Sequence, residues 1–209
     1  DIQTFKSEFR EKSYFKKPHL YRASDINQDL SILKFIEMLK KTKKPIVYLG
    51  GGVVNSGNKA SKEIFRFLKS TYFPCTQTLM GLGCFPTDDE QFLGMLGMHG
   101  TYEANLAMHQ SDLMICVGAR FDDRITGKVS GFSPKSKKVH IDIDASSFNK
   151  SVNVDLTIRG DITKVLKKIN QIIENKKIKF ERKNYKTWYS KIAKWRKKDC
   201  LSYKNNTEI

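Results

Sequence analysis

Glycine residues gather in this sequence at the points where short apolar runs end. The run Pro45–Leu49 leads directly into Gly50-Gly51-Gly52, and further glycine clusters lie at 78–83 and 94–100. Because glycine lacks a side chain, the backbone can approach a ligand closely and turn its N–H groups toward a phosphate. The clusters are therefore typical of a site for a nucleotide pyrophosphate, although a tight strand-to-helix turn also requires glycine for steric reasons alone.

Charged residues follow another apolar run in the same way. Arg120 and Arg124 flank Asp122 and Asp123. These side chains either form a structural network of ion pairs or leave one guanidinium free to bind an anion. His99 lies in the glycine cluster before them, where it could contact a ligand, cap a helix or fill a place in the core.

Several known catalytic and binding patterns are absent from the sequence. The dinucleotide fingerprint is incomplete, because Asn55 stands where its last glycine would be, and no acidic residue follows Thr76 to hold a ribose. This disfavours an ordinary NAD dehydrogenase. The sequence contains no P-loop, no nucleophile elbow and no cluster with metal-ligand spacing, and its four cysteines form no CxxC pair. We therefore predict no metal site in this chain.

Helices and strands that would position these loops alternate along the chain. Apolar residues recur at helical spacing over 27–41, 59–70, 102–109 and 162–173. In the first of these segments the recurring residues are Leu30, Leu33, Ile36 and Leu39. Short, nearly continuous apolar runs predict buried parallel strands at 45–49, 73–76, 113–117, 138–143 and 156–158. We expect an α/β fold, with a Rossmann-like parallel sheet of about six strands and helices on both faces.

The length and composition fit one folded domain. The 209 residues are 39% hydrophobic, which is enough for a sizeable core. No apolar stretch reaches the roughly 18 residues that a membrane-spanning helix needs, and the N-terminus lacks the apolar stretch of a signal peptide. We therefore expect no membrane partner.

The net charge is strongly positive, at +16, which would permit binding to nucleic acid. The lysines are scattered, however, and no aromatic platform for bases accompanies them, so we expect a solvated basic surface and no nucleic-acid partner. In the most basic segment, aromatic and aliphatic residues fall at helical spacing, namely Tyr185, Trp188, Ile192 and Trp195. This stripe predicts packing against this domain or a neighbouring one, with stacking on nucleic-acid bases as the alternative.

Four phrases of the sequence resemble one known family. They are Thr78-Leu-Met-Gly-Leu-Gly83, Gly94-Met-Leu-Gly-Met-His-Gly-Thr-Tyr-Glu-Ala-Asn105, Val117-Gly-Ala-Arg-Phe-Asp-Asp-Arg124 and His140-Ile-Asp-Ile-Asp144. The resemblance is to the central domain of the acetolactate synthase catalytic subunit, a thiamine-diphosphate enzyme of branched-chain amino-acid synthesis. It implies a linker from an N-terminal domain over 1–21, a central FAD-binding domain over 22–174 and a basic linker helix toward a C-terminal domain over 175–209.

The resemblance implies that the central domain binds FAD as a structural cofactor, without a redox role. The implied contacts are Arg22, Gly50, Gly51, Gly52, Thr78, Leu79, Leu96, Gly97, Met98, His99, Gly118, Ala119, Arg120, Asp122, Arg124, Asp142, Ile143, Gly160 and Asp161. Arg124 would also orient the carboxylate of the incoming 2-keto acid, a task that suits a bidentate guanidinium. One departure is Ala145, which stands where the family usually has proline and predicts a looser turn.

The whole enzyme that the resemblance implies decarboxylates pyruvate and joins the product to a second 2-keto acid. Its thiamine diphosphate and Mg²⁺ would be held by the N- and C-terminal domains, so we expect no catalytic residue in this chain and no activity from it alone. A homodimer or tetramer, a regulatory small subunit, and a bacterial cytoplasm or a plastid would fit such an enzyme. Two alternatives stay open. One is the middle domain of a sister enzyme, such as glyoxylate carboligase, pyruvate oxidase or a decarboxylase, and the other is a stand-alone module for ADP or NAD.

Overall fold

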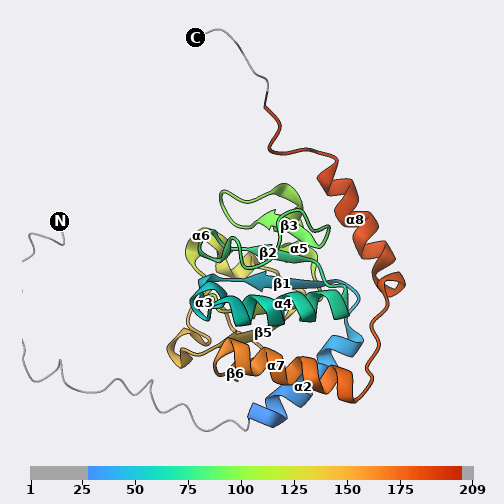
Figure 1. Ribbon diagram of the computed structural model, residues 1–209. Helices are drawn as coiled ribbons and strands as arrows, with labels where there is room; N and C mark the ends of the chain where they lie inside the picture. The colour runs from blue at the N-terminus through green and yellow to red at the C-terminus, as the bar shows by residue number, and fades with distance from the viewer. Residues whose placement is uncertain (1–27, 204–209) are drawn as a thin grey trace, which may run out of the picture.

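The computed structural model of this chain describes residues 28–203. Arg22 and the predicted linker over 1–21 lie outside the described residues. Figure 1 shows a central sheet with helices packed around it. The strands of the sheet are β1 (Pro45–Leu49), β2 (Cys75–Gln77), β3 (Phe92–Met95), β4 (Leu113–Val117), β5 (Lys137–Asp142) and β6 (Leu156–Arg159).

Helices surround this sheet. They are α2 (Gln28–Lys41), α3 (Gly51–Asn55), α4 (Asn58–Thr71), α5 (Tyr102–Gln110), α6 (Asp123–Thr126), α7 (Ile162–Asn175) and α8 (Lys186–Arg196). Short 3₁₀ helices are η3 (Leu79–Gly81), η4 (Val129–Gly131), η5 (Ala145–Ser147) and η6 (Arg182–Tyr185). Within residues 28–203, no helix is both long and apolar enough to cross a membrane.

All strands run parallel, in the order β3-β2-β1-β4-β5-β6. The predicted α/β fold with a Rossmann-like parallel sheet is confirmed. β1 and β4 are buried along their whole length, as their continuous apolar sequences predict for strands covered on both faces. The chain moves outward from β1 to β2 and returns from β3 to β4, so right-handed crossovers place α4 and α5 on opposite faces.

Strand β3 is absent from the elements that the apolar runs predict. Gly94 is expected there to start a glycine cluster that opens a helix, but Gly94 and Met95 instead end a short edge strand. This strand pairs with β2 through Cys75↔Phe92 and Gln77↔Met95, with a shift of register between them. The sequence does not predict β3 because this four-residue strand contains a glycine with a φ of +93°. It therefore lacks the continuous apolar run of the inner strands.

The buried face of α2 differs from the predicted one. The spacing predicts an apolar stripe that includes Leu30 and Leu33, yet these side chains are 51% and 42% exposed. Ile32 and Phe35 are buried in their place. The ring of Phe35 stacks on that of Phe67 in α4, with centroids 6.3 Å apart. The helix carries two overlapping apolar stripes, and packing against α4 buries the one with the aromatic side chain.

The basic helix α8 packs on the body of the domain. The indole N–H of the buried Trp188 donates a hydrogen bond of 2.9 Å to the carbonyl oxygen of Pro45, the first residue of β1. The guanidinium of Arg196 donates to the carbonyl oxygens of Glu90 and Phe92, beside the edge strand β3. The aromatic stripe therefore packs on this domain, one of its two expected neighbours.

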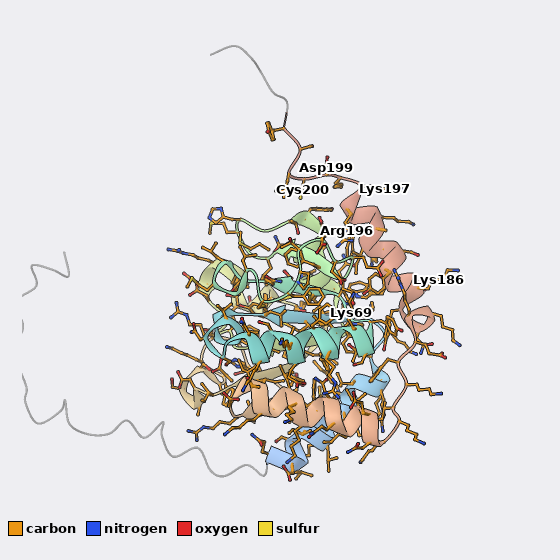
Figure 2. The ribbon with its side chains drawn as sticks, in the orientation of Figure 1. Lys69, Lys186, Arg196, Lys197, Asp199 and Cys200 are labelled. Carbon is orange, nitrogen blue, oxygen red and sulfur yellow. The ribbon has the colours of Figure 1, made fainter. Side chains whose placement is uncertain are left out.

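Helix α8 lies at the opposite end of the strands from α3 and α6. In Figure 1, α3 and α6 gather at one end of the sheet, and α8 runs along the other. Figure 2 shows Lys186 at the start of α8 and Lys197 directly after its last residue, and both side chains are exposed. Both lysines are thus solvated, and Lys186 lies away from the carboxyl ends of the strands, near the Trp188 contact with the start of β1.

Candidate nucleotide cofactor site

The order of the strands reverses direction between β1 and β4. From β1 the chain continues to β2 and β3 on one side, and from β4 it continues to β5 and β6 on the other. In open parallel sheets, ligands bind outside the carboxyl ends of the strands at such a reversal. Two loops meet there, Gly50–Gly52 after β1 and Gly118–Arg120 after β4. The Gly52 N–H donates to the carbonyl oxygen of Gly118 at 2.9 Å, which ties the two loops together.

Both loops require glycine because their backbones touch. A Cβ atom on Gly50 would lie 2.2 Å from the carbonyl oxygen of Gly118 and 2.4 Å from the Cβ of Ala119. Gly118 has a φ of +63°, and its own Cβ would lie 2.8 Å from the Cα of Gly52. These glycines therefore have a steric role. Within residues 28–203, the N–H groups of Ala119 and Arg120 have no hydrogen-bond acceptor, so they stay available to a ligand.

The loop after β2 is held by two polar side chains. The Thr78 hydroxyl caps η3 by accepting a backbone N–H at 3.0 Å. Gln77 is fully buried, and its amide donates to the carbonyl oxygen of Phe85 and accepts the Gly83 N–H, both at 3.0 Å. Leu79 is 69% exposed. The loop therefore presents an apolar side chain at the carboxyl edge of the sheet, and Gln77, which is not among the predicted site residues, anchors it.

The loop after β3 is joined to the segment that follows β4. The side-chain amide of Asn105 accepts the Gly97 N–H at 2.8 Å and donates to the Gly97 carbonyl oxygen at 2.9 Å. The next residue, Met98, donates its N–H to the carbonyl oxygen of Arg124 at 2.9 Å. Asn105, another residue outside the predicted set, thereby holds the backbone of Met98 beside that of Arg124.

Replacing Asn105 with alanine is expected to loosen this loop without unfolding the domain. The variant leaves both backbone groups of Gly97 without their partner, and each lost hydrogen bond removes about 1 kcal/mol. We therefore expect the amide hydrogens of Gly97 and Met98 to exchange with solvent about tenfold faster, as measured by NMR. Gln110→Ala is the control, because the Gln110 side chain forms no hydrogen bond within residues 28–203. Unchanged exchange rates in Asn105→Ala would contradict the role of the Asn105 side chain in holding Gly97.

The two arginines after β4 differ in their surroundings. The Arg120 guanidinium forms an ion pair with Asp122 at 2.8 Å. Arg124 is exposed, and in the described part of the chain its guanidinium has no ion pair or hydrogen bond. The Asp123 side chain, the Arg124 N–H and the Arg120 guanidinium lower the pKa of the Asp122 carboxyl from its ordinary value. Arg120 is therefore held in an ion pair, and the guanidinium of Arg124 is available for an anion. These are the two arrangements that the sequence leaves open.

The ends of β5 and β6 continue the same edge. The Asp142 carboxylate accepts the Asp144 N–H at 2.9 Å, and the Asp142 carbonyl oxygen accepts the Gly160 N–H at 3.0 Å. Asp161 caps α7 by accepting the Lys164 N–H at 3.0 Å. Each of these carboxylates therefore already holds the local backbone. The second oxygen of Asp142 lies 3.7 Å from Nε2 of the buried His140.

Exposure divides the predicted contact residues at this edge. Leu96 is buried, whereas His99 is exposed. The apolar side chains of Leu79, Met98 and Ile143 are 69%, 74% and 63% exposed. Because every strand is parallel, all the predicted contacts within residues 28–203 lie at the last residue of a strand, as Asp142 does, or in the segment that follows one. Exposed apolar residues gathered at one edge indicate a surface that another molecule covers.

A parallel sheet with glycine loops at its reversal of strand order is typical of Rossmann-like domains that bind nucleotide cofactors. The family described as "Thiamine pyrophosphate enzyme, central domain" has a model that matches residues 32–169. This chain belongs to that family, which confirms the resemblance to its central domain.

The relatives of this chain include acetolactate synthases. The acetolactate synthase large subunit of Buchnera aphidicola subsp. Schizaphis graminum (strain Sg) is 44% identical over 172 residues, which cover 82% of this chain and 29% of the relative. The acetolactate synthase isozyme 3 large subunit of Escherichia coli (strain K12) is 38% identical over 177 residues, 85% of this chain and 30% of the relative. The chloroplastic acetolactate synthase of Arabidopsis thaliana is 39% identical over 177 residues, 85% of this chain and 26% of the relative. The chain thus spans less than a third of the length of these relatives.

Proposed function

We propose that this chain is the FAD-binding central domain of an acetolactate synthase. The observation that carries the proposal is the reversal of strand order between β1 and β4, with the loops 50–52 and 118–120 in backbone contact beside it. Identity of 38–44% to acetolactate synthase sequences supports that enzyme over its sister enzymes.

The residues at this edge fit FAD. The free N–H groups of Ala119 and Arg120 offer donors to a diphosphate, and the Arg120 guanidinium, which is paired with Asp122 through one nitrogen, keeps further N–H donors. Exposed apolar side chains such as Met80 and Met98, both 74% exposed, would cover a flat apolar ring. Within residues 28–203, the cofactor would be held by Gly50–Gly52, Thr78, Leu79, Leu96–His99, Gly118–Arg120, Asp122, Arg124, Asp142, Ile143, Gly160 and Asp161. FAD would then act as a structural cofactor that joins the loops of all six strands.

The activity of the whole protein belongs to the same proposal. It would condense pyruvate with a second 2-keto acid, with thiamine diphosphate and Mg²⁺ held by domains outside this chain. The free guanidinium of Arg124 supports a role in holding the carboxylate of the incoming acid, because a guanidinium binds carboxylates through two parallel hydrogen bonds. A homodimer or tetramer, a regulatory small subunit, and a location in a bacterial cytoplasm or a plastid are part of this proposal.

Ligand binding to the purified chain tests the proposed cofactor. FAD at about a hundred times its dissociation constant should add roughly 2.7 kcal/mol of stability, which raises the melting temperature by roughly 5–11 °C. NAD should produce no shift. Arg120→Ala should weaken FAD binding about tenfold, since it removes a charged donor at the reversal point. Lys186→Ala, on α8 at the other end of the strands, should bind FAD like the wild type. A shift with NAD or ADP and none with FAD would overturn the flavin assignment.

A further inference from the structure

His140 is a fully buried histidine in β5, in surroundings that are mostly aromatic. Both of its ring nitrogens lack a hydrogen-bond partner within residues 28–203. The rings of Phe121 and Phe148 pack edge-on against the imidazole, with centroids 5.2 Å and 5.0 Å away. A neutral imidazole always carries one N–H, and a buried N–H without an acceptor is unfavourable. The ring therefore requires an acceptor for that proton.

The Asp142 carboxylate lies beside this ring, because side chains two residues apart on a strand point to the same face of the sheet. Nε2 of His140 is 3.7 Å from Oδ2 of Asp142, which is too long for a hydrogen bond. The carboxylate torsion of aspartate is soft, however, and such contacts often tighten when a site binds its ligand. In the neighbouring strands His140 pairs with Cys116 and Thr157, whose side chains are uncharged. Asp142 is therefore the acceptor that this face offers.

The position of the ring proton follows from this arrangement. With the proton on Nδ1, the lone pair of Nε2 would face the lone pairs of Asp142, and the N–H would have no acceptor within residues 28–203. With the proton on Nε2, the N–H lies beside Oδ2 and can donate to it. A second ring proton would add a buried N–H without an acceptor. We therefore expect a neutral imidazole with its proton on Nε2.

We propose that His140 is a positioning residue of the cofactor site, which acts by donating its Nε2–H to Oδ2 of Asp142. The Asp142 side chain is 15% exposed, so its carboxylate reaches from the buried ring to the cofactor edge. The Asp144 N–H holds the other oxygen, Oδ1, at 2.9 Å. The two donors together fix the plane of the carboxylate, and its remaining lone pairs accept N–H or O–H donors of the cofactor. That Asp142 meets the cofactor rests on the proposed function, whereas its contact with His140 does not.

A long-range ¹H–¹⁵N NMR spectrum of the imidazole rings, recorded without FAD, tests the contact. The nitrogen that carries the proton resonates far upfield of the other, so the spectrum identifies it directly. We expect the proton of His140 on Nε2. Asp142→Ala removes the acceptor, so the shifts of the two ring nitrogens should move toward each other as both forms of the ring become populated. Asp88→Ala, at an exposed carboxylate before β3, should leave them unchanged.

Two amide substitutions at His140 test its role in binding. The side-chain nitrogen of glutamine can occupy the place of Nε2, whereas that of asparagine reaches only the place of Nδ1. His140→Gln should therefore bind FAD within about threefold of the wild type, and His140→Asn about tenfold more weakly. A histidine that only fills space would not distinguish the two amides in this way. His109→Asn, at an exposed histidine of α5, is the control and should bind FAD like the wild type. Urea midpoints confirm that each variant is folded.

Either arm can overturn the positioning role. A ring proton on Nδ1, or ring shifts that Asp142→Ala leaves unchanged, would exclude the contact with Asp142. Equal FAD affinities of His140→Gln and His140→Asn would exclude a role of that contact in binding. FAD that bound to none of these proteins would overturn the proposed function instead, and the ring shifts of the FAD-free chain would still decide the contact.

Discussion

Gly50→Ala is expected to destabilise the domain by about 3 kcal/mol or more. The added Cβ would lie 2.2 Å from the carbonyl oxygen of Gly118 and 2.4 Å from the Cβ of Ala119, and neither atom can rotate away. Relief of the overlap requires the ends of β1 and β4 to separate, where Leu49 pairs with Val117 at the centre of the sheet. The midpoint of unfolding in urea measures this effect.

Gly131→Ala is the matched control for this substitution. A Cβ on Gly131 would meet nothing within 4 Å, so the stability should change by no more than about 0.5 kcal/mol. If Gly50→Ala unfolded at the same urea concentration as Gly131→Ala, the two loops could not be in the backbone contact on which the cofactor site depends. The folded fraction of Gly50→Ala should also bind FAD more weakly than the wild type, since the loops after β1 and β4 are displaced.

Trp188→Ala is expected to destabilise the domain by about 3–5 kcal/mol. Trp188 is 2% exposed, and its ring packs edge-on against Trp195 with centroids 5.7 Å apart. Its loss leaves a cavity and also leaves the buried carbonyl oxygen of Pro45 without the indole N–H. Because Pro45 begins β1, the whole domain should unfold at lower urea, rather than α8 alone.

Two variants separate the causes of this effect. Trp188→Phe keeps a ring and removes the hydrogen bond, so it should have an intermediate effect of about 1–3 kcal/mol. Trp195→Ala removes a half-buried ring that makes no indole hydrogen bond within residues 28–203, and should cost less than Trp188→Ala. If Trp188→Ala lost helical signal but kept the wild-type midpoint, α8 would be an independent linker. That the segment 175–209 leads toward a further domain stays a prediction.

The strand pattern was predictable where burial is complete. The run 113–117 is apolar throughout and forms β4 with the same bounds, because a strand covered on both faces needs an apolar residue at every position. β3 lacks this signal, since it lies at the edge of the sheet and contains Gly94. The order of the strands could not be predicted, because parallel neighbours are joined by long crossovers that carry no pairing signal in the sequence.

The candidate site divides in a similar way. Glycines such as Gly50 and Gly118 were predictable, because a residue without a side chain directly after an apolar run marks a tight turn. The roles of Gln77 and Asn105 were not predictable, since each side chain forms hydrogen bonds with backbone groups whose position depends on the folded loop. One sequence signal could have indicated the role of Gln77. An amide residue at the end of a buried strand needs hydrogen-bond partners, and the backbone of the following loop can supply them. Arg22, another predicted contact, lies outside the described residues.

Chemical-shift mapping of FAD on the ¹⁵N-labelled chain tests whether the cofactor binds at the reversal of strand order. We expect saturable shifts at the amides of 50–52 and 118–120, where the loops after β1 and β4 meet, and unchanged amides at the start of α8, at the other end of the strands. Saturable binding that leaves both loops unperturbed would contradict a cofactor site at this place, and so would the absence of any shift at saturating FAD.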